Sequence, residues 1–399
     1  MQILISAGEA SGDLYAASLV EFLRERLPQA RFFGCAGPRM RAAGVEPVID
    51  AAKLGVVGLV EVIRHIPEIY GEYRKLLREA ERRRPQLAIL TDSPDFHLRV
   101  AGKLKRRGIP VEYLIAPQVW AWRKGRLKTL RRNIDELLCI FPFEEEFFRK
   151  NNVPVHYIGH PLKRLVKPAM TRENWRAKHG LAPDRPLAVL LPGSRPGEIG
   201  RHLPTVAAAA ARMRAALPEL QFALAAPAGL AARTGSHFFT QPFLDQSIQT
   251  DRTGGPGFAP VFVEGETWDA IAHADVALAA SGTVTMECAL LGTPMVTYYR
   301  VTQASWWMGR LLVDVPFYTM VNLIARERVV PELIQNEMTA ENISREALRL
   351  LTAPGAARTM RAALERVSGS LDTGSHPMEV AAGIVARRLQ PPKDWKHES

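Results

Sequence analysis

Short apolar runs alternate with longer amphipathic segments through most of the chain. The apolar runs lie at residues 3–6, 86–91, 111–115, 137–141, 187–191, 222–226, 261–263 and 276–279. Short continuous apolar runs bounded by turn residues are typical of strands buried in a parallel sheet, and the segments between them have helical spacing. Strands that alternate with helices form βα units. The pattern therefore predicts an α/β protein with two doubly wound, Rossmann-like domains facing a cleft.

The two βα series divide the chain into domains. We expect an N-terminal domain over residues 1–165 that binds an acceptor, a second domain over 166–375 that binds an anionic donor, and a C-terminal helix and tail over 376–399. The polar segment 163–186 is the predicted linker. Segment 233–260 is polar and is predicted to be an inserted loop. The C-terminal helix could return to the first domain or pack on a second copy of the chain, so a homodimer stays open.

A strand, turn, helix and strand at residues 275–296 indicate a phosphate site. The first strand ends in the turn Ser281-Gly282-Thr283. In open parallel sheets ligands bind beyond the carboxyl ends of the strands, where the N-terminus of the next helix favours phosphate. Glu287 lies one helical turn later and could accept hydrogen bonds from vicinal hydroxyls such as those of a ribose. The alternative is a capped helix with a solvated glutamate.

Two further segments of the second half offer ligand contacts. The strand at 187–191 is followed by Gly193, Ser194 and Arg195, and an arginine at a strand end can clamp a diphosphate with its planar guanidinium. An arginine on a solvated loop is the alternative. Downstream, the amide of Asn322 could hold a ligand oxygen.

The first strand leads into a turn of small and polar residues. Glu9, Ser11 and Asp13 supply polar contacts there, while the small residues let an acceptor or another ligand approach the backbone. Ser11 or Asp13 could instead only cap the following helix, and for Asp13 we favour the cap.

A carboxylate follows the strand at 86–91. Asp92 lies at the carboxyl end of that strand, in the region of the cleft, where it could serve as a general base. Its neighbour Asp95 is predicted to cap the next helix.

The segment 54–69 is apolar but holds glycines and charges. As a helix it would place four apolar residues on one side: Val56, Leu59, Val60 and Ile63. Basic tracts follow at 74–84 and 103–107. An apolar face beside basic residues can sit on an anionic bilayer. A core helix with solvated charges is the alternative.

Composition narrows the class of protein. The 399 residues are 47% hydrophobic and 23% charged, as in soluble globular proteins. A net charge of +11 suggests an anionic partner, which could be nucleic acid, lipid or a phosphorylated substrate. No nucleic-acid-binding motif is present, so we expect no nucleic-acid partner. The separated cysteines Cys35, Cys139 and Cys288 indicate buried thiols of a cytoplasmic protein, and the start of the chain has no export signal. No HExxH motif or Cys/His cluster indicates a metal.

A series of motifs resembles one enzyme family. The motifs are GEASGD at 8–13, AGPRM at 36–40, DSPDF at 92–96, PQVWAWR at 117–123, FPFE at 141–144, IGHPL at 158–162, LPGSR at 191–195, ASGT at 280–283, ECAL at 287–290 and VNLIA at 321–325. In this order they resemble lipid-A-disaccharide synthase, a bacterial membrane-associated glycosyltransferase of family 19. Segment 233–260 has no counterpart in the resemblance, and Ala16 stands where the family usually has glycine.

The resemblance implies a GT-B fold and an inverting transfer without metal or cofactor. UDP-2,3-diacylglucosamine would donate its sugar to the 6-hydroxyl of 2,3-diacylglucosamine 1-phosphate, giving the β-1,6-linked lipid A disaccharide 1-phosphate and UDP. By similarity Asp92 would be the base and Arg195, with Gly193 and Ser194, would hold the diphosphate. The remaining donor contacts would come from Ser281, Gly282, Thr283, Glu287 on the ribose, and Asn322 near the phosphates or sugar. The enzyme would act in lipopolysaccharide synthesis as a peripheral protein on the inner face of the cytoplasmic membrane.

Three other functions stay open. The chain could be a UDP-N-acetylglucosamine 2-epimerase-like enzyme or a GT-B enzyme with a soluble acceptor. It could also be a non-catalytic UDP-lipid-binding protein on the membrane. An epimerase would act on plain UDP-N-acetylglucosamine, and a binding protein would never release UDP.

Overall fold

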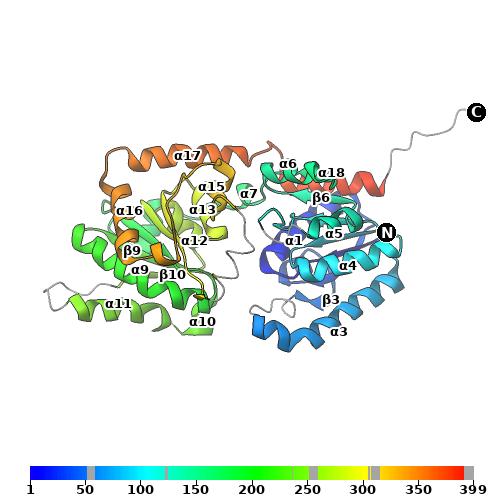
Figure 1. The fold of residues 1–399 in the computed structure, drawn as a ribbon, viewed down its shortest axis with the longest axis horizontal. Coiled ribbons are helices and arrows are strands. Elements are labelled where there is room, and N and C mark those ends of the chain that lie inside the picture. Colours follow the sequence, from blue (N-terminus) through cyan, green and yellow to red (C-terminus); the bar gives the residue numbers. More distant parts are fainter. Residues whose placement is uncertain are drawn as a thin grey trace, which may run out of the picture. The chain divides into compact units, whose positions relative to one another are not determined.

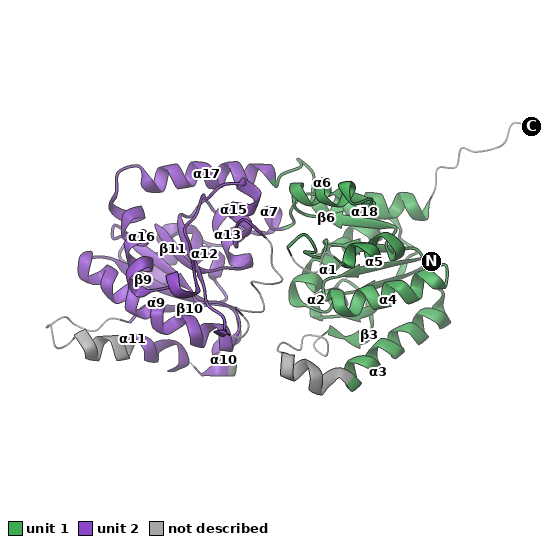
Figure 2. Cartoon of the chain, viewed as in Figure 1, with its two compact units in different colours: residues 1–161, 371–399 green, residues 162–370 purple. Residues whose placement is uncertain are grey.

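The computed structural model contains two α/β units, each built on a parallel sheet (Figure 1). It describes residues 1–51, 59–121, 125–235, 237–250, 259–303, 306 and 315–390, without the side chains of 59–66, 233 and 244–250. Unit 1 comprises residues 1–161 and 371–399, and unit 2 comprises residues 162–370 (Figure 2).

Unit 1 is a doubly wound sheet with helices on both faces. Its described strands are β1 (Gln2–Ser6), β2 (Arg31–Ala36), β3 (Glu46–Asp50), β4 (Leu87–Thr91), β5 (Val111–Leu114), β6 (Glu136–Cys139) and β7 (Val155–Tyr157). They pair in parallel in the order β3-β2-β1-β4-β5-β6-β7. The main helices are α1 (Ala10–Arg26), α2 (Pro38–Ala42), α3 (Leu59–Arg83), α4 (Pro94–Arg106), α5 (Arg126–Asn133), α6 (Pro142–Lys150) and α18 (Pro377–Leu389).

Unit 2 repeats the same plan. Its described strands are β8 (Leu187–Leu191), β9 (Gln221–Ala226), β10 (Val261–Glu264), β11 (Val276–Ala280), β12 (Met295–Tyr299) and β13 (Glu332–Ile334), in the order β10-β9-β8-β11-β12-β13. Its helices are α7 (Leu162–Leu165), α8 (Arg172–Lys178), α9 (Pro196–Ala216), α10 (Leu230–Thr234), α11 (His237–Thr250), α12 (Thr267–Ala272), α13 (Thr283–Leu290), α15 (Met320–Ala325), α16 (Ala340–Thr352) and α17 (Ala356–Ser370).

Each sheet has a point where the strand order reverses. In unit 1 it lies between β1 and β4, and in unit 2 between β8 and β11. Ligands of open α/β sheets bind at such switch points, beyond the carboxyl ends of the strands. The two doubly wound domains expected from the sequence are confirmed, whereas the cleft between them stays a prediction.

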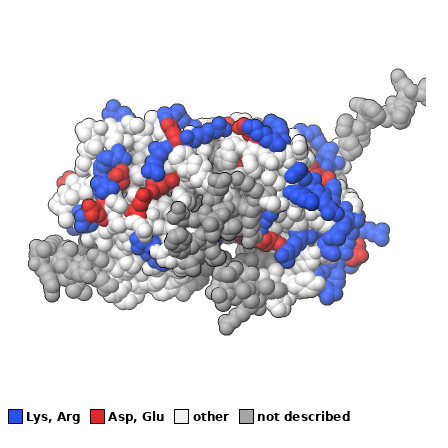
Figure 3. Space-filling model, in the orientation of Figure 1, with Lys and Arg blue, Asp and Glu red and all other residues white. Residues whose placement is uncertain are grey.

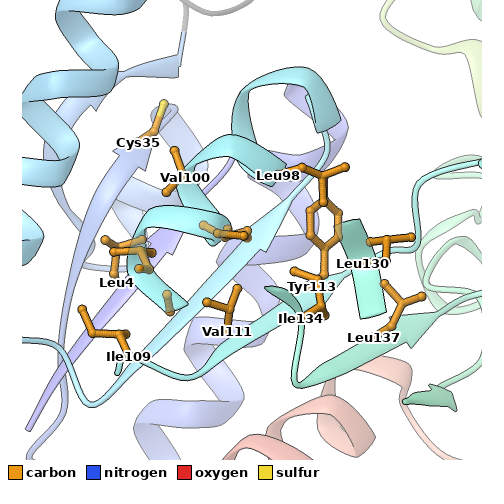
Figure 4. Packing of buried hydrophobic residues seen from close by; sticks show 14 of the residues in the cluster. Leu4, Cys35, Leu98, Val100, Ile109, Val111, Tyr113, Leu130, Ile134 and Leu137 are labelled. Atoms are coloured by element: carbon orange, nitrogen blue, oxygen red, sulfur yellow. The ribbon is translucent and has the colours of Figure 1, made fainter. Parts of the chain in front are cut away.

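Buried apolar side chains hold the helices against the sheets. In unit 1 the core joins β1, β2, α4, β5 and β6, and Leu4, Val111 and Tyr113 are fully buried in it (Figure 4). Burying one such side chain stabilises the fold by about 1.5–3 kcal/mol. Cys35, Cys139 and Cys288 are free and buried, as predicted.

The segment 163–186 is not a linker. It contains α8, and there Trp175 is fully buried while Arg176 is 1% exposed. The Arg176 guanidinium donates to the carbonyl oxygens of Ala182 at 2.9 Å and Arg185 at 2.7 Å. The segment is therefore part of unit 2. The boundaries between the units along the chain fall at residues 161/162 and 370/371 rather than at 165/166 and 375/376.

The segment 233–260 is not a structureless loop. It carries α11, whose Phe239 and Phe243 are buried. The ring of Phe239 lies 5.0 Å from that of Phe262 in β10, centroid to centroid. Aromatic residues four positions apart form one helical face, which the polar composition of the segment concealed. Residues 251–258 lie outside the described part.

The C-terminal helix α18 packs on α1 within unit 1. Arg26 pairs with Glu379 at 3.1 Å, and Arg388 in α18 pairs with the buried Glu112 of β5 at 2.8 Å. Of the two placements that the sequence left open, the structure shows the return to the first unit.

The proposed membrane segment is described only in part. Leu59, Val60 and Ile63 lie in α3, but the structure does not describe their side chains. Val56 lies outside the described residues. Among the described residues, no helix combines the length and the apolar character needed to cross a bilayer.

Candidate active site

The switch point of unit 1 carries Asp92, directly after β4. Asp92 has φ 52° and Ser93 has φ 37°, so two consecutive non-glycine residues adopt the left-handed region. That conformation costs about 1–2 kcal/mol per residue and is typical of functional sites. The strained turn points the Asp92 side chain toward the end of the neighbouring strand β1.

The Asp92 carboxylate lies in a pocket of backbone N–H groups. It accepts hydrogen bonds from the N–H of Gly8 at 2.8 Å and of Glu9 at 3.1 Å, both in the turn after β1. A Cβ atom at Gly12 would lie 1.7 Å from Asp92 Oδ2, so any larger residue there would displace the carboxylate. The Asp92 side chain is 14% exposed, and burial raises the pKa of its carboxyl group to about 7 although these N–H groups lower it. A carboxylate with such a pKa can accept a proton near neutral pH.

Two buried side chains contact the carbonyl oxygen of Asp92. The Nδ1 of His97 lies 3.0 Å from it, and the hydroxyl of Tyr113 donates to it at 2.6 Å. A carbonyl oxygen only accepts, so His97 Nδ1 carries the proton and Nε2 accepts from the Ser6 hydroxyl at 2.8 Å. Burial lowers the pKa of His97 to about 4, so the ring is neutral at physiological pH.

The residues expected to contact the acceptor have different surroundings. Glu9 and Ser11 are exposed beside the Asp92 pocket, at the start of α1. Asp13 is buried, and its carboxylate accepts from the N–H groups of Gly37, Arg39 and Met40 at 2.9–3.1 Å. Asp13 therefore caps α2 and not its own helix. Its carboxylate is occupied by the protein rather than offered to a substrate.

Asp95 does not cap α4 either. The residue at the cap position is Ser93, and Asp95 in the first turn pairs with Arg126 of α5. The left-handed turn at Asp92 and Ser93 replaces the extended conformation that a capping aspartate needs.

Glu144 is a buried carboxylate that the sequence analysis did not single out. It is 1% exposed in the first turn of α6 and accepts from the indole N–H of Trp120 at 3.0 Å and from the N–H groups of Ile140 and Phe141 at 3.3 Å and 3.2 Å. Burial raises the pKa of Glu144 to about 7. Glutamate three residues after a helix start is a capping signal that could have revealed it.

The switch point of unit 2 brings two of the predicted turns together. β8 and β11 are parallel neighbours, with Leu191 opposite Ala279, so the turns that follow them lie at the same edge of the sheet. One holds Gly193, Ser194 and Arg195 before α9, and the other holds Ser281 and Gly282 before α13, which begins at Thr283. The first N–H groups of two helices thus face the same region, an arrangement that favours an anion.

Side chains of α9 fix the turn after β8. His202 is fully buried, and its Nδ1 donates to the Pro192 carbonyl at 2.9 Å while its Nε2 accepts from the Arg300 N–H at 3.1 Å. Gly193 has φ 129°, and Glu198 Oε2 accepts from the Ser194 N–H at 3.1 Å. Arg195 itself is exposed. These contacts leave the guanidinium outside the turn, where it could meet a diphosphate.

Glu287 lies one turn into α13, as the sequence predicts. Burial raises the pKa of its carboxyl group, and a hydrogen bond from the Trp268 side chain of α12 acts against that rise. Its contact with a ribose stays a prediction.

Asn322 has its amide group fully engaged within unit 2. Its Nδ2 donates to the carbonyl of Val330 at 2.9 Å and to Glu332 Oε1 at 3.0 Å, and its Oδ1 accepts from the N–H of Val329 at 2.8 Å. The residue is fully buried. It fixes the segment before β13, and in this structure its amide is not offered to a ligand oxygen, contrary to the expectation.

Comparison with known proteins identifies the family. A family model described as lipid-A-disaccharide synthetase matches residues 3–378. The lipid-A-disaccharide synthase of Solibacter usitatus is 57% identical over 370 residues, covering 93% of each chain. That of Myxococcus xanthus is 43% identical over 392 residues, covering 98% of each chain.

Solved structures share the fold at low identity. A UDP-GlcNAc 2-epimerase from Neisseria meningitidis bound to UDP-GlcNAc has a TM-score of 0.62 at 12% identity and covers 98% of this chain and 99% of its own. The calicheamicin glycosyltransferase CalG4 has a TM-score of 0.57 at 16% identity and covers 97% and 98%. These likenesses show the GT-B fold alone, and activity follows from the closer relatives. The chain belongs to the lipid-A-disaccharide synthase family of glycosyltransferases.

Proposed function

We propose that the protein transfers the diacylglucosamine unit of UDP-2,3-diacylglucosamine to the 6-hydroxyl of 2,3-diacylglucosamine 1-phosphate. The names of the relatives support a lipid A disaccharide as the product. The observation that carries the mechanism is the Asp92 carboxylate, held by Gly8 and Glu9 at a switch point with its pKa raised to about 7. A base that takes the proton of a sugar hydroxyl needs a pKa near the working pH.

In the proposed step the acceptor oxygen attacks the anomeric carbon of the donor sugar. Its proton passes to the Asp92 carboxylate as the new C–O bond forms. The bond between the anomeric carbon and the UDP oxygen breaks, and UDP leaves with the electron pair. A single displacement inverts the anomeric centre and gives the β-1,6 linkage.

The leaving UDP requires stabilisation of its negative charge. We assign this to Arg195, with Gly193 and Ser194, and to the turn Ser281-Gly282-Thr283. The two turns lie at adjacent strand ends and precede two helix N-termini. Charge-assisted hydrogen bonds and helix dipoles can stabilise a diphosphate without a metal.

The rival functions differ in their products. An epimerase would act on UDP-N-acetylglucosamine alone, and a non-catalytic binding protein would release no UDP. We therefore test UDP release with the donor alone and with both lipids, in detergent. Release that needs both lipids and is lost in Asp92→Asn supports the transfer. Release without acceptor, or none with both lipids, would contradict it.

We further propose that the protein is peripheral on the inner face of the cytoplasmic membrane. Support comes from exposed cations of unit 1, which include Arg99, Lys103, Arg106, Lys128, Arg131 and Arg132. Figure 3 shows Lys and Arg gathered over α4 and α5. The sequence adds the apolar segment at the start of α3. A basic surface beside apolar side chains binds anionic lipid. A homodimer stays a prediction.

The membrane proposal has a direct test. Val60→Glu and Ile63→Glu should release the protein from anionic liposomes in a flotation assay, while Ala232→Glu on α10 of unit 2 should leave binding unchanged. Unchanged binding of both α3 variants would contradict the proposal.

A further inference from the structure

The contacts of the Asp92 carboxylate fix its side chain, and a separate set of contacts fixes its backbone. Asp92 and Ser93 hold φ values of 52° and 37° where β4 passes into α4. Non-glycine residues keep this conformation only where the surroundings determine it. The question is which groups do so.

The carbonyl oxygen of Asp92 accepts two hydrogen bonds from side chains. His97 on α4 donates from Nδ1 at 3.0 Å, and Tyr113 on β5 donates from its hydroxyl at 2.6 Å. Both side chains are fully buried. If Asp92 left the left-handed region, its carbonyl would turn away and leave two buried donors without their acceptor, which is strongly unfavourable.

The same contacts connect neighbouring strands at the switch point. His97 Nε2 accepts from the hydroxyl of Ser6, the last residue of β1. β1, β4 and β5 are adjacent in the sheet. Ser6, His97, Asp92 and Tyr113 therefore form one hydrogen-bonded chain across three strands, and the Asp92 carboxylate accepts from the N–H groups of Gly8 and Glu9.

We propose that His97 and Tyr113 are positioning residues that hold Asp92 in its left-handed conformation and so aim its carboxylate at the acceptor hydroxyl. This inference rests on the proposed role of Asp92 as the base. His97 Nδ1 lies 3.9 Å from Asp92 Oδ1, beyond hydrogen-bond distance, and the hydroxyl of Tyr113 donates to the backbone carbonyl of Asp92. They act on the reaction through the Asp92 backbone.

Burial raises the pKa of the Asp92 carboxyl group to about 7, and neighbouring groups modify that pKa. Glu9, in the turn after β1, raises the Asp92 pKa by its charge, and the Ser93 hydroxyl lowers it by a hydrogen bond. Burial keeps His97 neutral by lowering its pKa, and it raises the pKa values of Tyr113 and of Cys35 on β2 far above neutrality. The pH profile can therefore report the position of the carboxylate.

The test compares substitutions that remove one contact each. Tyr113→Phe keeps the ring and loses the hydroxyl. His97→Gln can reach Ser6 but not the Asp92 carbonyl, whereas His97→Asn places its amide nitrogen where Nδ1 was. We expect Tyr113→Phe and His97→Gln to lower kcat about tenfold each, as for a lost hydrogen bond, with both KM values little changed. His97→Asn should retain most of the activity.

The pH profile separates positioning from a structural role. When the carboxylate withdraws from the Gly8 and Glu9 N–H groups, its pKa rises, so the acid limb of kcat should move to higher pH in Tyr113→Phe and His97→Gln. Tyr157→Phe on β7 is the matched control and should leave both kcat and the limb unchanged. Thermal unfolding verifies that each variant is folded, and Tyr113→Phe carries the test should His97→Gln not fold.

Two failures are distinguishable. Unchanged kcat and an unchanged acid limb in Tyr113→Phe and His97→Gln, beside an inactive Asp92→Asn, would overturn this inference and leave the proposed base in place. Full activity of Asp92→Asn would overturn the base itself and the inference with it.

Discussion

At Gly12 the space for a single methyl group decides whether Asp92 can hold its position. A Cβ atom there would lie 1.7 Å from Asp92 Oδ2 and 2.8 Å from its Cγ. The backbone of α1 and the strained turn of Asp92 both resist movement, so the carboxylate must yield. Position 12 therefore needs glycine because of the proposed base and not because of helix α1.

We predict that Gly12→Ala lowers kcat about 100-fold, the effect expected of a displacement of about 1 Å at a catalytic group. Steady-state kinetics of UDP release measures it. Gly71→Ala in α3 is the matched control, because nothing lies within 4 Å of its added Cβ. A Gly12→Ala enzyme with wild-type kcat would show that the carboxylate does not need its present position.

The rate should depend on pH through Asp92. Its pKa is raised to about 7, and a base works in the deprotonated form, so kcat should rise with pH through about 7 and then level off. His97, with its pKa lowered to about 4, stays neutral over this range and adds no limb.

Glu144 has a pKa near that of Asp92, which requires a control. The acid limb should persist in Glu144→Gln if Asp92 causes it. A profile that is flat between about pH 6 and about pH 8, or a limb that disappears in Glu144→Gln, would contradict the assignment.

Single residues could be predicted only where their role follows from a strand end. The structure has Asp92 and the turns at Gly193 and Ser281 at strand ends, as predicted, because parallel strands bring their carboxyl ends together, and their contacts with substrates stay predictions. His97, Tyr113 and His202 could not be found, since their roles depend on contacts across strands that no local pattern encodes. Asn322 was assigned to a ligand, and Asp13 to a cap of its own helix, because the sequence does not show which backbone groups a buried polar side chain will satisfy.

At the scale of elements, α18 is held on unit 1 by a buried carboxylate. Glu112 of β5 is fully buried, with one oxygen on Arg388 and the other, Oε2, without a hydrogen-bond partner among the described residues. Burial raises the pKa of Glu112 to about 7 although Arg388 lowers it. The carboxyl group is therefore protonated in acid, and it needs its partner when ionised.

We predict that Arg388→Ala destabilises the protein by about 1–3 kcal/mol near pH 8, less than a fully buried pair because Arg388 is 31% exposed. The folded pKa of Glu112 lies above its unfolded value, so its stabilising contribution is present at low pH and is lost as pH rises through about 7. The decrease in the free energy of unfolding caused by Arg388→Ala should consequently be smaller near pH 5.5.

Urea unfolding at the two pH values measures the difference, with the neighbouring Arg387→Ala as control. An equal loss at both pH values would mean that Glu112 does not change its charge in this range.

Elements were predicted best where the apolar pattern was continuous. The buried strands β8 and β11 were found to within a residue, because short apolar runs between turns have few other interpretations. α8 and α11 were missed because polar composition hid the buried faces of Trp175 and Phe239. Composition describes a segment as a whole, whereas burial depends on which few residues share a face.

At the scale of the whole molecule, two doubly wound units each place their proposed chemistry at a switch point. Unit 1 offers a carboxylate held by backbone N–H groups, and unit 2 offers an arginine and two helix N-termini at adjacent strand ends. One half suits the loss of a proton from an acceptor, and the other suits a departing diphosphate. The central claim is that unit 1 supplies the base and unit 2 stabilises the departing diphosphate.

The measurement that tests it most directly is UDP release by the purified protein in detergent, with UDP-2,3-diacylglucosamine alone and then with 2,3-diacylglucosamine 1-phosphate added. The wild type should release UDP only with both lipids, and Asp92→Asn should release none above background while still binding UDP. Release that does not require the acceptor, or an Asp92→Asn enzyme as fast as the wild type, would contradict the account.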